Sequence, residues 1–220
     1  MPRTGGGPSP VVVIGVIGPV AAGKSMVLAE MARLGASTVR ADDVSRELLA
    51  PGQPLLDAVL AEFGPRYRRT DGSLDRRALA QLIFQNQEAR ARLEGILHPA
   101  MVARMGELVA AARDQAYPPP AVVIEAANLV PMGGLGLVDV TVLVTAERET
   151  RIRRLMARDG TARADAEALV ALHEALCLED FPADCVLATD GEESATRSAV
   201  QRLWRALVKD SDRTERVGPG

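Results

Sequence analysis

Residues 18–25 read Gly18-Pro19-Val20-Ala21-Ala22-Gly23-Lys24-Ser25, and this stretch decides the fold. It fits the pattern G-x-x-x-x-G-K-[ST] of a phosphate-binding loop, which joins a buried strand to a helix. An unbroken apolar run, residues 11–17, precedes it and predicts a strand buried on both faces. Residues 24–34 carry an apolar helical stripe, and Gly35 is placed to end that helix. These flanks favour a nucleotide-binding loop over a glycine-rich turn that carries a lysine by chance.

Each residue type in the loop has a physical task. Gly18 and Gly23 permit backbone torsions and close approach that side chains would obstruct. The backbone N–H groups can then point at phosphate oxygens, at the positive end of a helix. Lys24 neutralises the β and γ oxygens of ATP, and the Ser25 hydroxyl is the expected ligand for Mg²⁺. The expected nucleotide-binding residues of the loop are Gly18, Ala21, Ala22, Gly23, Lys24, Ser25 and Met26.

Further strands and helices alternate along the chain. Strands are expected from residue 38 and over 121–127, 138–144 and 185–187. Helical patterns cover residues 55–63, 76–84, 88–97, 101–113, 148–158, 164–176 and 194–208. Strands separated by helices predict an α/β fold with a parallel sheet covered on both sides.

The domain organisation follows from where this alternation is interrupted. Residues 11–208 are expected to form one domain. Its nucleotide-binding core takes residues 11–42 and 117–208. Residues 43–116, almost wholly helical, predict an inserted helical sub-domain. The Gly/Pro-rich segment 1–10 and the polar tail 209–220 are expected to be disordered.

Composition excludes several classes. With 26 basic and 29 acidic residues, the net charge of −3 gives no reason to expect nucleic-acid binding. No apolar run is long enough to span a membrane, and residues 1–10 do not form a secretory signal. Cys177 and Cys185 lack metal-site spacing and are interpreted as reduced thiols. We expect a cytoplasmic protein without an obligate protein partner.

The segment Arg40-Ala41-Asp42-Asp43 ends the second expected strand. Because the carboxyl ends of parallel strands line the ligand crevice, a carboxylate here should lie near the phosphate loop. Asp42 is a candidate for accepting the proton of an attacking hydroxyl, or for holding Mg²⁺ through water. The same residue would serve equally well as the N-cap of a helix beginning at Val44. The residues alone leave both interpretations open.

A series of motifs over residues 11–205 resembles the dephospho-coenzyme A kinase family. The middle block is the specific part, since D-G-x-L-D-R-x-x-L followed at this distance by H-P resembles one family. The motifs, in order, are Gly18–Ser25, Ala41-Asp42, Arg46-Glu47-Leu48, Pro51-Gly52, Phe63-Gly64, Asp71-Gly72-x-Leu74-Asp75-Arg76-x-x-Leu79, Phe84, Leu97-His98-Pro99 and Arg154-Leu155-Met156-Ala157-Arg158-Asp159-Gly160.

The resemblance implies a fold and a reaction. The fold is a P-loop NTPase three-layer fold, with a five-stranded parallel sheet, and residues 11–208 would form one P-loop kinase domain. The helical sub-domain at residues 43–116 would bind the substrate, and a helical lid would lie at about residues 148–178. The reaction transfers the γ-phosphate of ATP to the ribose 3′-hydroxyl of dephospho-coenzyme A, which is the last step of coenzyme A synthesis. The residues that match family positions are Asp42 as catalytic base, Lys24 and Arg158 as catalytic cations, Arg46, Arg76 and His98 as acceptor-binding residues, and Arg158 and Arg163 as lid residues over the nucleotide.

The chain departs from the family pattern mainly where ligands are recognised. Arg40 replaces an aspartate beside the proposed base, and Met26 replaces a threonine. A V-P-L-L-F-E stretch becomes residues 126–131, which include Asn128 and Pro131, and a glutamate is lost there. Beyond the lid, His173 replaces a glutamine. After the last expected strand, Ala188-Thr189 replaces the family's Asp-Asn pair, so the adenine contacts of that pair are not expected here.

Other interpretations of these residues stay open. His98 also fits a helix-end residue, and Arg76 a solvated charge. Arg154 and Arg158, one helical turn apart, would pair with nearby acids if exposed. His173, in an apolar helical stretch, is interpreted as partly buried structure rather than a ligand.

Other functions also stay open at this stage. The first is a kinase for another small-molecule acceptor, and the second is a non-catalytic ATP-binding protein. A GTPase lacks support because the sequence has no N-K-x-D motif and no D-x-x-G switch in the expected place. Glu125, near the end of a strand, is a weak candidate for the carboxylate of an ATPase motor.

Overall fold

The computed structural model describes residues 11–176 and 183–210. Residues 1–10, most of the expected tail and Cys177 lie outside these ranges. Cys185 is a free, half-buried thiol, in agreement with the sequence interpretation.

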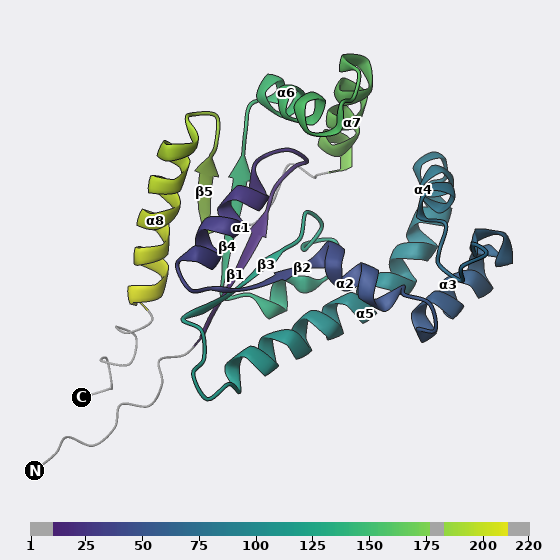
Figure 1. Ribbon diagram of the computed structural model, residues 1–220, viewed down its shortest axis with the longest axis horizontal. Coiled ribbons are helices and arrows are strands. Elements are labelled where there is room, and N and C mark those ends of the chain that lie inside the picture. The colour runs from purple at the N-terminus through teal and green to yellow at the C-terminus, as the bar shows by residue number, and fades with distance from the viewer. Residues whose placement is uncertain (1–10, 177–182, 211–220) are drawn as a thin grey trace, which may run out of the picture.

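A five-stranded parallel sheet forms the centre of the molecule (Figure 1). Its strands follow the spatial order β2-β3-β1-β4-β5, so the phosphate-loop strand β1 lies in the middle. In β1, successive residues alternate between the two faces and nearly all are buried, which explains its unbroken apolar sequence. The strands are β1 (Val12–Ile17), β2 (Ser37–Arg40), β3 (Ala121–Glu125), β4 (Val140–Thr145) and β5 (Cys185–Ala188).

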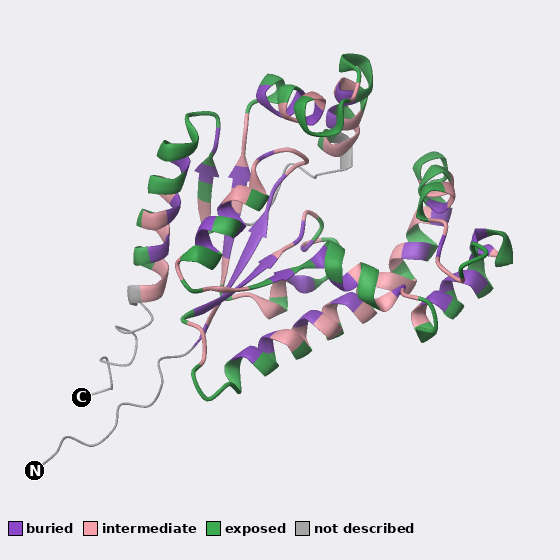
Figure 2. Cartoon of the chain, viewed as in Figure 1, coloured by how far each residue is buried: buried purple, intermediate pink, exposed green. Residues whose placement is uncertain are grey.

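Helices cover both faces of this sheet, which confirms the predicted three-layer α/β fold. On one face, α1 (Lys24–Arg33) and α8 (Glu193–Asp210) pack against Ile14 and Val16 of β1. On the other face, α2 (Ala41–Leu48) and the second half of α5 (Gln87–Arg113) pack against Val13 and Ile17. Figure 2 shows the buried residues concentrated on the strands and on the inner sides of these helices.

Gly35 ends α1 as the sequence predicts. Its φ of +104° is left-handed. Its N–H donates to the carbonyl of Ala32 and that of Ala36 donates to Met31. This is the Schellman arrangement, in which a glycine lets the chain leave the helix while the last carbonyls stay paired.

One expectation about the helices was wrong. Residues 88–97 and 101–113 were expected to form two helices, but α5 runs without a break from Gln87 to Arg113 with Pro99 inside it. Proline removes one helical hydrogen bond and normally breaks a helix. Here hydrophobic packing holds the helix on both sides of Pro99, because Leu93 belongs to the core of the helical sub-domain and Met101 to the core of the sheet.

Two helical units extend from the sheet (Figure 1). The helical sub-domain has a core of its own, built from α3 (Pro54–Phe63), the 3₁₀ turn η1 (Pro65–Tyr67), α4 (Arg76–Gln85) and the first half of α5. The lid consists of α6 (Arg148–Asp159) and α7 (Arg163–Leu176). Its small apolar core also packs against Val20 and Ala21 of the phosphate loop. A second 3₁₀ turn, η2 (Gly134–Leu137), leads into β4. The division of the chain at residues 43 and 116 stays a prediction.

Candidate active site

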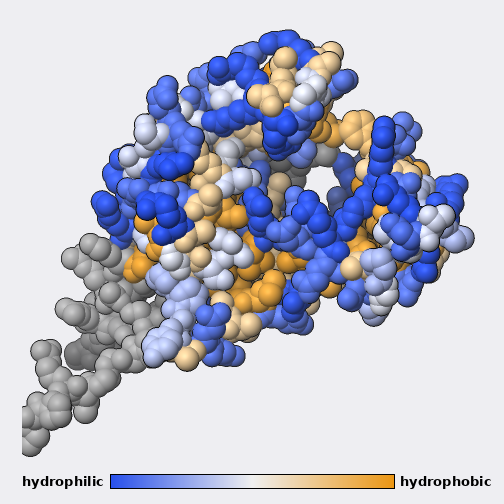
Figure 3. Space-filling view, in the orientation of Figure 1, coloured by the Kyte–Doolittle hydropathy of each residue, from blue (hydrophilic) through white to orange (hydrophobic). Residues whose placement is uncertain are grey.

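A cavity of about 750 Å³ lies where the phosphate loop, the start of α2, the end of β3 and the lid helices meet. Figure 3 shows a hollow between the lid and the sub-domain, bordered by both hydrophilic and hydrophobic residues. The residues that line the cavity are Val20, Ala21, Gly23, Lys24, Ser25, Ala41, Asp42, Glu125, Ala126, Ala127, Asn128, Arg154, Ala157, Arg158 and His173.

The two loop glycines are required by the backbone. At Gly18 a Cβ atom would lie 2.2 Å from the carbonyl oxygen of Val144, and φ is +142°. At Gly23 φ is +94°, and a Cβ would approach the Thr189 hydroxyl to 3.0 Å. Only glycine accepts both the torsions and the close approach. The loop therefore turns sharply from β1 into α1.

Ala21 also has a left-handed backbone, with φ of +59°. This conformation costs a residue with a side chain about 1–2 kcal/mol. Packing of Ala21 against the lid core and the bond from Arg154 to its carbonyl oxygen, 3.2 Å long, hold the loop in this shape. Contacts with the lid therefore offset the conformational cost at Ala21.

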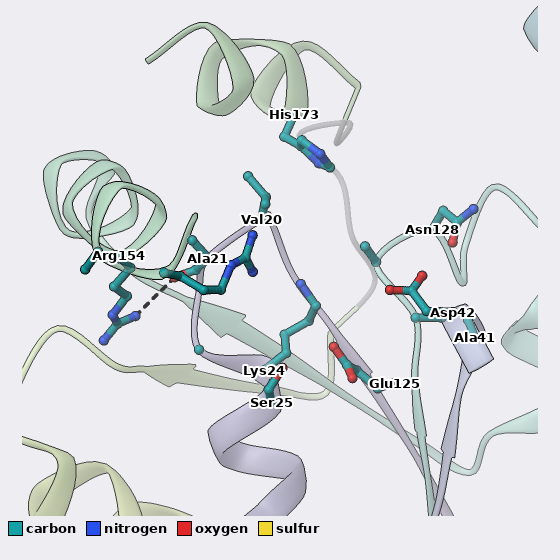
Figure 4. Close-up of a pocket in the computed structure, with 15 residues that line it drawn as sticks. Val20, Ala21, Lys24, Ser25, Ala41, Asp42, Glu125, Asn128, Arg154 and His173 are labelled. Carbon is teal, nitrogen blue, oxygen red and sulfur yellow. Dashed lines mark hydrogen bonds between the residues drawn. The ribbon is translucent and has the colours of Figure 1, made fainter. Parts of the chain in front are cut away.

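Lys24 and Ser25 open the first turn of α1, where helix N–H groups have no carbonyl partner within the helix. The Lys24 ammonium donates to the carbonyl oxygens of Gly18 and Pro19, both at 2.9 Å. This places its charge inside the curve of the loop (Figure 4). The helix end and the ammonium together make this part of the cavity a site for an anion.

Asp42 lines the side of the cavity opposite the phosphate loop (Figure 4). The alternative that it caps a helix starting at Val44 was wrong, because α2 begins at Ala41 and its N-cap is Arg40. The carboxylate of Asp42 is thus a member of the first helical turn, where a negative charge is favoured.

Arg40 does not pair with Asp42. It lies opposite Glu125 in the register of β2 and β3, and its Nε donates to the Glu125 carboxylate at 3.1 Å. Glu125 also lines the cavity, close to Lys24 and Ser25 (Figure 4). Its position at the carboxyl end of β3 was the available sequence signal for a role in the site.

Arg154 and Thr189 fasten the phosphate loop to the end of β5. The buried Thr189 hydroxyl donates to the carbonyl oxygen of Ala22 at 2.7 Å. Arg154 donates from Nη1 to that hydroxyl at 2.9 Å and from Nη2 to the Thr189 carbonyl at 2.5 Å. Arg154, for which the sequence analysis left open pairing with nearby acids, is instead part of the cavity wall.

The other two lid arginines differ in position. Arg158 lines the cavity, and its guanidinium forms two hydrogen bonds to Asp159, both 2.7 Å long. Arg163 is outside the cavity lining and is bound by Glu149 and Glu167. Those bonds raise the pKa of Arg163.

None of the expected acceptor residues, Arg46, Arg76 and His98, is among the residues that line the cavity. Arg76 donates to the Ser45 carbonyl at 3.2 Å, and Arg46 pairs with Asp43 at 2.7 Å. Burial, and then the positive charge of Arg46, lower the pKa of Arg76, whereas the charge of Asp42 acts in the opposite direction. The two guanidinium groups and the proposed base are therefore electrostatic neighbours.

The Nε2 atom of His98 on α5 lies 3.4 Å from the side-chain amide nitrogen, Nδ2, of Asn128. Burial lowers the pKa of His98, and the charge of Glu94 opposes the shift. Asn128 lines the cavity, whereas the exposed Pro131 does not. The sequence analysis marked Asn128 only as a departure from the family pattern in a recognition segment, and did not predict its contact with His98.

Not every predicted nucleotide-binding residue reaches the cavity with its side chain. Gly18, Ala22 and Met26 are absent from the lining: Gly18 and Ala22 are buried residues of the loop, and Met26 is half-buried on α1. Their expected contribution is through the backbone, which is consistent with these positions.

The residues present fit Mg²⁺. The Ser25 hydroxyl and the carboxylates of Asp42 and Glu125 line one cavity, and Mg²⁺ prefers such oxygen ligands. Within residues 11–176 and 183–210, no group of three or more His, Cys, Asp or Glu side chains is arranged to hold a metal alone. Phosphate oxygens and water would have to complete the coordination shell, as is usual for this ion.

A strand–loop–helix phosphate site in the middle of a parallel sheet, with a carboxylate opposite and a lid that carries arginines, is the arrangement that kinases of the P-loop class use. We assign the chain to that class. No helix in the part of the chain that the structure describes has the length and apolar character needed to cross a membrane.

Comparison with known proteins identifies the family. A sequence model of dephospho-CoA kinases matches residues 12–194. A dephospho-CoA kinase of Moorella thermoacetica is 40% identical over 200 residues, which cover 90% of this chain and 92% of the relative. The chain therefore belongs to the dephospho-CoA kinase family.

Solved structures agree with the fold. The protein TT1252 from Thermus thermophilus superimposes with a TM-score of 0.68 at 27% identity, over 94% of this chain and 99% of that one. A dephospho-CoA kinase from Campylobacter jejuni superimposes with a TM-score of 0.62 at 20% identity, over 90% of this chain and 98% of that one. At that identity the second match speaks for the fold alone.

Proposed function

We propose that this chain transfers the γ-phosphate of ATP to the ribose 3′-hydroxyl of dephospho-CoA. The observation that carries the proposal is the single cavity in which Lys24 and Ser25 of the phosphate loop lie opposite Asp42. Phosphoryl transfer needs these groups together, because it depends on positioning and on neutralising charge. Membership of a kinase family supplies the expected donor and acceptor.

On the donor side, the chain's residues hold and neutralise the triphosphate. The N–H groups of the loop and the first turn of α1 bind its oxygens, and Lys24 offsets charge on the β and γ phosphoryl groups. Bound Mg²⁺ would neutralise further charge on the same oxygens, held by Ser25 and, through water, by Asp42 or Glu125. Arg158 covers the phosphates from the lid and helps to exclude water.

On the acceptor side, Asp42 takes the proton of the 3′-hydroxyl as its oxygen attacks the γ-phosphorus. The bond between that phosphorus and the β–γ bridging oxygen breaks, and ADP leaves with both electrons of the bond. Arg46, Arg76 and His98 bind the acceptor and keep its hydroxyl in line with the leaving group. Arg163 lies outside the cavity lining, so binding of the nucleotide by Arg163 requires the lid to close.

Two small-molecule substrates suffice for this reaction. A cytoplasmic location, and independence from nucleic acid and from an obligate protein partner, stay predictions from the sequence.

The test is ADP release by the purified protein with Mg-ATP, with and without dephospho-CoA, while CoA is followed by mass. We expect equal amounts of ADP and CoA, formed only when both substrates are present. ADP and CoA should both be lost in Lys24→Ala, which removes the phosphate-neutralising charge. Nucleotide binding without CoA formation would overturn the assignment of the acceptor and direct the search to other alcohols or to a sensing role.

A further inference from the structure

His173 occupies a position that packing alone does not explain. On α7 the buried residues Ala166 and Val170 form one stripe, and His173 continues it at the helical spacing i+3. The lid core contains Ala166 and Val170 but not His173. Where the stripe passes over the cavity, the sequence has an imidazole in place of an apolar side chain. His173 lines the cavity from the lid side, and Lys24 lies across from it (Figure 4).

The surroundings of this imidazole are cationic. The positive charges of Lys24 from α1 and Arg151 from α6 repel a protonated His173 ring. Arg154 and Arg158 of α6 line the same cavity. Burial first, and then the charges of Lys24 and Arg151, lower the pKa of His173. The cavity is therefore built to receive negative charge.

Among the residues that the structure describes, no carboxylate pairs with the imidazole. The neighbouring Glu174 is bound by Arg151 and Arg148. Asp42 and Glu125 line the far side of the cavity. Among residues 11–176 and 183–210, the His173 ring has no hydrogen-bond partner, although its N–H groups are strong donors.

We propose that His173 binds the polyphosphate of the bound nucleotide from the lid side, opposite Lys24, by donating an imidazole N–H to a phosphate oxygen. This inference rests on the proposed function, since it requires ATP in the cavity. The neutral ring offers one N–H and the imidazolium two, so the contact strengthens as the ring is protonated. A glutamine would keep one donor and lose this dependence on pH.

The first test is NMR of the imidazole signals in the intact protein. The chain has two histidines, so Cε1–H spectra contain two ring signals, which His98→Gln and His173→Gln assign. Binding of Mg²⁺ with the non-hydrolysable β,γ-imido analogue of ATP should shift the His173 signal and raise its titration midpoint by about one pH unit. The same titration with Mg-ADP tells whether the contact is to the γ-phosphate.

The second test is nucleotide affinity against pH, measured by calorimetry between about pH 6 and 8. The affinity of the wild-type protein should rise toward low pH more than that of His173→Gln. Protonation of the nucleotide itself affects both proteins equally, so the difference between their slopes reports His173. His173→Ala should bind about tenfold more weakly than the wild type at pH 6. Leu169→Ala, which loosens the lid core without removing a donor, should keep the pH slope of the wild type.

The outcomes separate this inference from the proposed function. Nucleotide binding with an unmoved His173 signal and equal pH slopes in the wild type and His173→Gln would overturn the inference alone. Failure of the wild-type protein to bind nucleotide would overturn both.

Discussion

At the residue scale, Asp42 is the side chain on which the chemistry depends most directly. It faces the phosphate loop across the cavity, whereas Asp43 next to it points to Arg46 and is outside the cavity lining. The two neighbouring carboxylates therefore have different tasks, although the sequence presents them as a pair.

Replacing Asp42 by asparagine removes a proton acceptor and keeps the shape of the side chain. We expect kcat to fall by about 10²- to 10⁴-fold, the usual contribution of a general base, with little change in ATP affinity. Steady-state kinetics and calorimetry of nucleotide binding measure the two quantities. Asp43→Asn is the matched control, and it should leave kcat within about twofold and raise only the KM of the acceptor. An Asp42→Asn variant with wild-type kcat would show that another group takes the proton.

Thr189 carries a second prediction at this scale. Its buried hydroxyl joins the carbonyl of Ala22 to the guanidinium of Arg154, so valine of nearly the same shape would remove both of these hydrogen bonds. Thr189→Val should lower the free energy of unfolding by about 1–3 kcal/mol and weaken nucleotide binding. Urea denaturation and calorimetry measure these changes. Thr189→Ser, which keeps the hydroxyl, should lose less than half as much; equal losses in both variants would point to the methyl group instead.

At the scale of elements, α1 is fixed to α8 by the buried carboxylate of Glu30. This side chain accepts from Arg33 at 2.7 Å and from Gln201 of α8 at 2.7 Å. The hydrogen bond from Arg33, followed by that from Gln201, lowers the pKa of Glu30 to about 2. Since α1 carries Lys24 and Ser25, the contact also supports the phosphate loop.

The pKa of Glu30 sets a prediction for acid stability. A carboxyl with a depressed pKa in the folded state stabilises the protein above its ordinary pKa, and this contribution is lost as pH falls. We expect Glu30→Gln to be less stable than the wild type at pH 7. The difference should shrink as pH falls from about 4.5 toward 2. Urea denaturation across this range measures it, and the exposed Glu192→Gln serves as control. A difference that stays constant with pH would mean that charge is not the cause.

At the scale of the whole molecule, the sheet and the helical sub-domain have separate hydrophobic cores joined along α5. Leu56 is buried in the sub-domain, and Met31 of α1 is buried in the core between the sheet, α1 and α8. Damage to one core should therefore affect one substrate more than the other.

This separation predicts that two cavity-creating substitutions affect the binding of different substrates. Leu56→Ala and Met31→Ala should each lose about 2–5 kcal/mol of stability. Leu56→Ala should raise the KM for dephospho-CoA and leave ATP affinity within about twofold, because the two sites are held by different cores. Met31→Ala should weaken ATP binding. Hydrogen exchange would show which core opens, and equal effects of both variants on ATP affinity would contradict the separation.

The sequence by itself determined the phosphate loop, the three-layer fold and the family. Gly18, Gly23, Lys24 and Ser25 follow from local backbone torsions and charge, and a buried parallel strand has an unbroken apolar sequence. Such features depend on only a few consecutive residues. The motifs of the middle block are likewise read directly from their spacing.

Only the tertiary structure decided which distant side chains share the cavity. The pairing of Arg40 with Glu125, the bonds of Arg154 to Thr189 and the position of His173 opposite Lys24 depend on strand order and on how the lid packs. The unbroken α5 is a similar case, since two cores overcome the helix-breaking tendency of Pro99. These outcomes depend on contacts between residues far apart in the chain, which local patterns do not record.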